Sequence, residues 1–112
     1  MELRAEYAKF AAEHGAASEE GDSEAANRAF EKLVAVYRAL RNLGETGQNV
    51  VAGLMEHESP SVRGWAAAHS LKSHEDKAIA TLENLSDGVG AVAFTAEIVL
   101  GEWRNGTLEV SE

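Results

Sequence analysis

Cysteine is absent from this chain of 112 residues, and proline occurs once, at Pro60. Without cysteine the chain can form no disulfide, no thiolate nucleophile and no cysteine-bound zinc site, so nothing in it depends on an oxidising compartment. No apolar run approaches the length that spans a bilayer, and the first residues carry no apolar targeting segment. We therefore expect a soluble protein of the cytoplasm.

Basic residues are scarce as well: ten Lys and Arg stand against nineteen Asp and Glu, a formal net charge of −9. This charge repels phosphate backbones, so we expect binding neither to nucleic acid nor to anionic membranes. The carboxylates gather in residues 13–24 and 45–58. Two explanations stay open, namely solvated helix ends that maintain solubility, and a surface that steers a basic protein partner.

Length and composition favour one folded domain. A hydrophobic content of 45% is ordinary for a folded protein, and 112 residues suffice for one modest core but not for two. We expect a single domain over residues 1–112, in which residues 107–112 form a short C-terminal tail.

Apolar residues recur at helical spacing, and the single proline and the scattered glycines divide the chain into about six segments. Gly15 and the polar residues 18–21 are expected to end the first helix, and Gly106 the last. In the second segment Asp22 or Ser23 is the expected N-cap, and Gly44 ends the helix. Ser73 followed by Asp76 resembles a capping box. The expected helices cover residues 2–17, 23–43, a stretch around 50–58, a stretch that begins at Pro60, a stretch from 73 to 86 and residues 89–103.

One stretch of sequence occurs twice, because residues 61–71 align with residues 90–100 at an offset of 29. The alignment pairs Trp65 with Phe94, Ala67 with Ala96, and Leu71 with Leu100. A fixed period of this size is typical of stacked supersecondary units. The sequence therefore predicts an all-α fold in which three stacked helical hairpins form a short α-solenoid.

The helices after Pro60 and Val89 carry apolar residues on more than one side, which indicates inner helices. Between the packed sides lies a strip of small residues with a polar border. A strip of small side chains lets another backbone approach closely, although the third hairpin or a second copy of the chain would fill it equally well. The predicted partner-binding residues are Gly64, Ala68, Lys72, Ala93, Glu97, Gly101 and Arg104.

Residues 61–67, with a valine–arginine pair followed after two residues by paired alanines, resemble the second helix of a HEAT repeat. Together with residues 26–28, 94–97 and 102–106, they make the chain similar to a small bacterial family of HEAT-like proteins. Similar domains occur as immunity proteins of polymorphic toxin systems. The resemblance implies a HEAT- or armadillo-like fold and a protein that binds and blocks one cognate toxin by occlusion. It brings no catalytic residues.

The four histidines do not have the spacing of metal ligands. His57 lies between two glutamates, but adjacent helical residues point in different directions and cannot converge on one ion. His69 lies on the same side of its helix as Trp65, where a hydrogen-bonded core histidine is the usual explanation. We expect neither a metal nor a cofactor.

Glu97 is the only charged residue between Asp87 and Glu102, and a carboxylate among so many apolar neighbours is a candidate general acid. An ion pair with one of several arginines, or simple exposure, would explain it as well. No phosphate-binding glycine loop or nucleophile elbow accompanies it. A protein-binding module, most concretely a toxin inhibitor, is therefore favoured. The alternatives are an enzyme or small-ligand binder using Glu97 with His69 or Arg63, and a homo-oligomeric scaffold.

Overall fold

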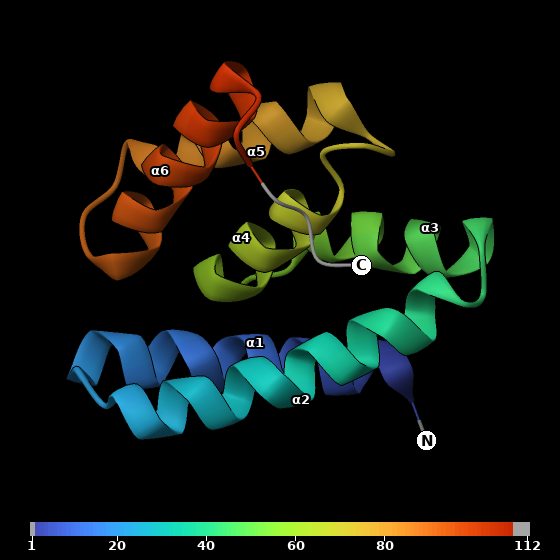
Figure 1. Ribbon diagram of the computed structural model, residues 1–112, viewed down its shortest axis with the longest axis horizontal. Coiled ribbons are helices and arrows are strands. Elements are labelled where there is room, and N and C mark those ends of the chain that lie inside the picture. The colour runs from blue at the N-terminus through green and yellow to red at the C-terminus, as the bar shows by residue number, and fades with distance from the viewer. Residues whose placement is uncertain (1, 109–112) are drawn as a thin grey trace.

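This computed structural model describes residues 2–108 of the chain (Figure 1). Six α-helices and one 3₁₀ turn, joined by short connections, occur in this part of the chain. The elements are α1 Leu3–Glu20, α2 Ser23–Arg41, α3 Glu45–Gly53, η1 Leu54–Glu56, α4 Pro60–His69, α5 Glu75–Ser86 and α6 Ala91–Asn105. No strand occurs within residues 2–108. The predicted all-α fold with about six helices is confirmed.

Helix α4 lies in the middle of the molecule. In Figure 1, the α1–α2 hairpin runs along one side, the α5–α6 hairpin lies on the other, and α3 leads into α4 between them. α4 packs against α1, α5 and α6, so its predicted role as an inner helix is confirmed. The overall dimensions, 33 × 30 × 26 Å, are nearly equal. The stacking order of a solenoid stays a prediction.

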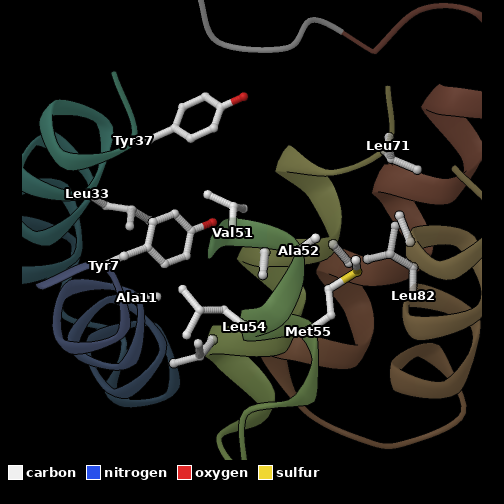
Figure 2. Close-up of a cluster of buried hydrophobic side chains, with 14 of the residues drawn as sticks. Tyr7, Ala11, Leu33, Tyr37, Val51, Ala52, Leu54, Met55, Leu71 and Leu82 are labelled. Carbon is white, nitrogen blue, oxygen red and sulfur yellow. The ribbon is translucent and has the colours of Figure 1, made fainter. Parts of the chain in front are cut away.

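The core is one buried cluster to which all six helices contribute. Figure 2 shows Tyr7, Ala11 and Leu33 of the α1–α2 hairpin meeting Leu54 of η1. Larger side chains with at most 1% exposure are Tyr7, Leu33, Leu40, Leu54, Val62, Leu71 and Leu82. Burial of a leucine-sized side chain stabilises a fold by about 1.5–3 kcal/mol, so this cluster holds the hairpins together.

Helix α1 is longer than predicted, because it continues through Gly15 and ends at Gly21, whose φ of 73° is the left-handed conformation that favours glycine. Gly15 serves a different purpose. A Cβ atom there would overlap the side chain of Ser61, so the glycine permits α1 to lie close to α4. A contact glycine of this kind is locally indistinguishable from a helix terminator.

Two predicted helix starts have different outcomes. Asp22 accepts a hydrogen bond from the backbone N–H of Ala25 at 3.0 Å, which confirms it as the N-cap of α2. The capping box at Ser73 is wrong, because α5 begins at Glu75 with His74 in the N-cap position. The Ser73 hydroxyl oxygen lies 2.9 Å from Nδ1 of His74 instead.

Helix α6 is not the inner helix that the sequence suggested. It begins after Gly90 and ends at Gly106, and the side chains of Phe94 and Ile98 on it are 66% and 43% exposed. The repeat partner of Phe94, Trp65, is partly buried because Phe30 of α2 and His14 of α1 pack against it, with ring centroids 5.7 and 5.1 Å away. The α1–α2 hairpin covers α4 but leaves this face of α6 uncovered.

Residues 107–108, at the start of the predicted C-terminal tail, follow the end of α6 and have no regular secondary structure. Leu108 packs against the core cluster, which ties the chain down beyond the end of α6. Residues 109–112 lie outside the described part of the chain.

Candidate functional site

A groove of about 130 Å³ lies between α1, α4 and α6. Three helices that are distant in sequence form its walls. The lining residues include His14, Gly15 and Ser18 of α1, Gly64, Trp65 and Ala68 of α4, and Val92, Thr95 and Val99 of α6. Leu82 of α5 also lines it. The walls are almost entirely apolar, and the groove is open to solvent.

The groove exists because small residues face one another across it. A Cβ atom on Gly64 would meet Leu85 at 3.6 Å and Val92 at 3.8 Å, which is ordinary van der Waals contact. The space beside Gly64 is therefore large enough for additional atoms. With Ala68 and Ala96 also lining the groove, the chain leaves a space that larger side chains would have filled.

An exposed apolar face of α6 adjoins the groove. At about 100° per residue, Phe94, Thr95 and Ile98 lie on one side of the helix, and Thr95 also lines the groove. We call these three residues the α6 face. In the loop before the helix, Val89 is 96% exposed. The exposed apolar surface thus continues from the α6 face, across Thr95, into the groove.

Carboxylates border this surface. Around the helix, Glu97 and Glu102 flank Phe94 and Ile98 on either side, and both carboxylates are exposed. At the start of α6, the side chain of Glu19 accepts a hydrogen bond from the backbone N–H of Ala91 at 2.8 Å. A negatively charged group is favourable there because it meets the positive end of the helix dipole. The site is apolar in its centre and acidic at its edges.

The structure does not bring the predicted strip of small residues together. Gly64 and Ala68 line the groove, whereas Ala93 is buried and Glu97 and Gly101 are exposed, and none of these three lines it. Of the polar border, Lys72 is exposed between α4 and α5, and Arg104 pairs with Glu83 at 2.7 Å. The reason is that α6 turns Val92, Ala96 and Val99 toward the groove. A partner-binding role for the predicted residues stays a prediction.

The residues that sequence reasoning missed are Phe94, Thr95, Ile98, Val92 and Val99. A signal for the first was present, since Phe94 aligns with Trp65 and a large aromatic recurs at that position of the repeat. The alignment does not tell whether another helix covers the aromatic. That question is decided by how the hairpins pack.

In the described part of the chain, Glu97, His69 and Arg63, the residues of the alternative enzyme site, do not contact one another in the ways that a catalytic centre would require. Arg63 donates from Nη1 to the backbone carbonyls of His57 and Glu58, both at 2.9 Å. His69 binds Tyr7, and Glu97 is an exposed side chain of α6. No contact observed in residues 2–108 joins Glu97 to either of the other two. The geometry provides no support for a shared catalytic centre of these residues.

His69 joins the α1–α2 hairpin to α4. Its Nδ1 lies 2.6 Å from the hydroxyl oxygen of Tyr7, and its ring stacks on Tyr37 with centroids 3.7 Å apart and planes within 7°. Burial, with a smaller contribution from Arg41, lowers the pKa of His69 to about 3. Burial also raises the pKa of Tyr7 well above its ordinary value. At neutral pH the Tyr7 hydroxyl and the His69 imidazole that share this hydrogen bond are therefore both uncharged, and the prediction of a hydrogen-bonded core histidine is confirmed.

Within residues 2–108, no three His, Asp or Glu side chains are placed to hold one metal ion, and none of the helices there has the length and apolar character of a membrane span. Comparison of the chain with protein-family models, with curated proteins and with solved structures found no match. The groove and the α6 face are accordingly interpreted from their own geometry.

Proposed function

We propose that this chain is a protein-binding domain whose partner contacts the α6 face and the adjoining groove, and whose role is to bind and block a basic toxin domain by occlusion. The observation that carries the proposal is the exposure of Phe94 and Ile98, at 66% and 43%, beside an apolar groove. Exposed apolar surface with a polar border is typical of protein interaction sites.

Burial of the α6 face by a partner would contribute favourable free energy to binding. Full burial of a phenylalanine or isoleucine side chain is worth about 1.5–3 kcal/mol, and most of that for Phe94 is still unused in the free protein. Large side chains that become fully buried at the centre of an interface contribute most of the binding energy. Phe94 has the size and the exposure that such a residue needs in the free protein.

The negative charge of the chain favours one class of partner, a basic protein. The formal net charge of −9 and the carboxylates that flank the α6 face favour a basic protein, which they attract before contact is made. The toxin role is supported by the resemblance of the chain, through residues 26–28, 61–67, 94–97 and 102–106, to small bacterial HEAT-like proteins, since similar domains occur as immunity proteins. Inhibition by occlusion needs no catalytic residue, no cofactor and no metal, and we place it in the cytoplasm.

The test is co-expression with the product of the adjacent gene, followed by binding kinetics for the wild type and two variants. Phe94→Ala removes an exposed apolar side chain from the α6 face, and Leu43→Ala removes one, 54% exposed, at the end of α2. We expect Phe94→Ala to raise the dissociation rate constant at least about tenfold, and Leu43→Ala to leave it unchanged. The association rate constant should fall with salt in all three proteins, because the charges are unaltered.

Two results would contradict the proposal. One is wild-type binding by a Phe94→Ala protein whose circular dichroism and melting curve are normal. The other is a dimer of this chain in sedimentation that Phe94→Ala dissociates, since a second copy would then occupy the α6 face.

A further inference from the structure

The groove between α1, α4 and α6 has the size of one side chain. Its volume of about 130 Å³ is well below the roughly 300–1,000 Å³ of pockets that hold cofactors or drug-sized ligands. An apolar cavity of about 150 Å³ accommodates one benzene molecule. The groove therefore fits a single leucine, isoleucine or phenylalanine side chain.

The chemistry of the walls also favours an apolar occupant. Leu82, Val92, Val99 and Trp65 supply carbon surface, and the few polar groups come from residues such as Ser18 and Thr95. The groove is partly open, so hydroxyl groups at its rim can remain hydrated. A charged group placed inside would lose its water without gaining an ion pair, which is costly.

The surroundings determine how the side chain is presented. A segment that lies along the α6 face crosses Thr95, which belongs both to that face and to the groove. Residues before and after the inserted side chain then lie near the carboxylates at the border, Glu19 at one end and Glu102 on the helix. Lysine or arginine at those places gains favourable charge interactions, and aspartate or glutamate meets repulsion.

We infer that the groove is an anchor pocket that takes one leucine-, isoleucine- or phenylalanine-sized side chain of the partner, presented between cationic residues. This inference rests on the proposed function and adds to it the chemical class of the bound segment. The apolar side chain of the partner matches the apolar groove, and its cationic residues match the carboxylates at the border of the groove. This complementarity supplies specificity as well as affinity.

The experiment uses two probes that need no identified partner. Benzene reports on the pocket itself, and a seven-residue peptide with a central leucine between lysines reports on the anchor. Binding of each is followed by chemical-shift changes of backbone amides in a nitrogen-15 NMR titration. We expect both probes to shift the amides of Gly64, Ala68 and Thr95, and benzene to displace the peptide.

Matched variants test the pocket. Ala68→Leu places three further carbon atoms in the groove, and Ala80→Leu makes the same change at an exposed site on α5. Both probes should bind at least about tenfold more weakly to Ala68→Leu and unchanged to Ala80→Leu, tenfold being 1.4 kcal/mol. If Ala68→Leu does not fold, Gly64→Ala narrows the groove with only ordinary contacts and replaces it.

Matched peptides test the anchor and its flanks. Replacing the leucine by alanine should weaken binding about tenfold, and replacing the lysines by glutamates should abolish it. Equal binding of the leucine and alanine peptides, or benzene shifts that persist in a folded Ala68→Leu protein, would overturn the inference. A failure of the proposed function can be told apart from a failure of this inference. If the proposed function is wrong, Phe94→Ala leaves partner binding intact, whether or not benzene and the peptide bind in the groove.

Discussion

Removal of one oxygen atom from the core, by Tyr7→Phe, should destabilise the protein by about 1–3 kcal/mol. Tyr7 is fully buried, and its hydroxyl is hydrogen-bonded to Nδ1 of His69 at 2.6 Å. The variant fills nearly the same volume, so packing changes little. It leaves the ring nitrogen of His69 without its partner in a partly buried place, and that loss is the source of the cost.

Urea denaturation followed by circular dichroism measures the effect. With a slope of about 1–3 kcal/mol per molar for a protein of this size, a loss of 2 kcal/mol lowers the urea midpoint by about 1 M. The control is a double-mutant cycle that adds His69→Leu. The double variant, Tyr7→Phe with His69→Leu, removes both polar partners of the hydrogen bond together. We expect the double variant to be more stable than the sum of the single effects implies, by about 1 kcal/mol or more.

A Tyr7→Phe protein with an unchanged urea midpoint and slope would refute a stabilising role of the Tyr7 hydroxyl. Additive single effects in the cycle would also refute it, because they would mean that Tyr7 and His69 do not stabilise each other. Either result would mean that the hydrogen bond between Tyr7 and His69 contributes little to the stability of the fold.

His69, the glycines at positions 47 and 101, and Glu19 are each expected to affect stability in a measurable way. The pKa of His69 is about 3 in the folded state and near 6.5 in the unfolded state, so between these pH values the unfolded chain binds a proton that the folded protein does not. The stability contributed by this group is therefore complete above about pH 6.5. As the pH drops toward 3, the free energy of unfolding falls by up to about 1.4 kcal/mol per pH unit. Denaturation at several pH values should show a shallower decline for His69→Leu, and equal declines would contradict the assignment. Gly101→Ala should stabilise the protein by about 1 kcal/mol, because nothing lies near its new Cβ atom. Gly47→Ala should destabilise it by about 1–3 kcal/mol, because the new Cβ atom overlaps the backbone of Leu40. Changes of melting temperature with the same sign for both variants would count against the close packing of α3 on α2. Glu19→Ala should lower the melting temperature by about 4 °C through loss of the bond to the Ala91 N–H, and Glu20→Ala, the matched control, should not.

Local features of the sequence predicted the helices well. The apolar stripe of α2, the N-cap at Asp22 and the terminating Gly106 act within one or two helical turns, so neighbouring residues contain all the information needed. Errors arose where the relevant neighbour is distant. Gly15 resembles a helix stop, yet its partner is Ser61, 46 positions along the chain.

Of the candidate site, the sequence predicted the α4 residues Gly64 and Ala68 but not the α6 residues around them. A helix that is apolar on nearly every side does not reveal which side faces its neighbours, because each orientation buries a similar area. The repeat paired Phe94 with Trp65 and so suggested that both are covered.

The sequence by itself determined an all-helical chain, the positions of most helix ends, the recurring aromatic and the excess of negative charge. Only the tertiary structure decided that the α1–α2 hairpin covers Trp65 while Phe94 stays exposed, and that α1, α4 and α6 enclose a groove. The physical reason is that helix formation depends on residues three and four positions apart, whereas exposure of a side chain depends on which distant helix packs over it.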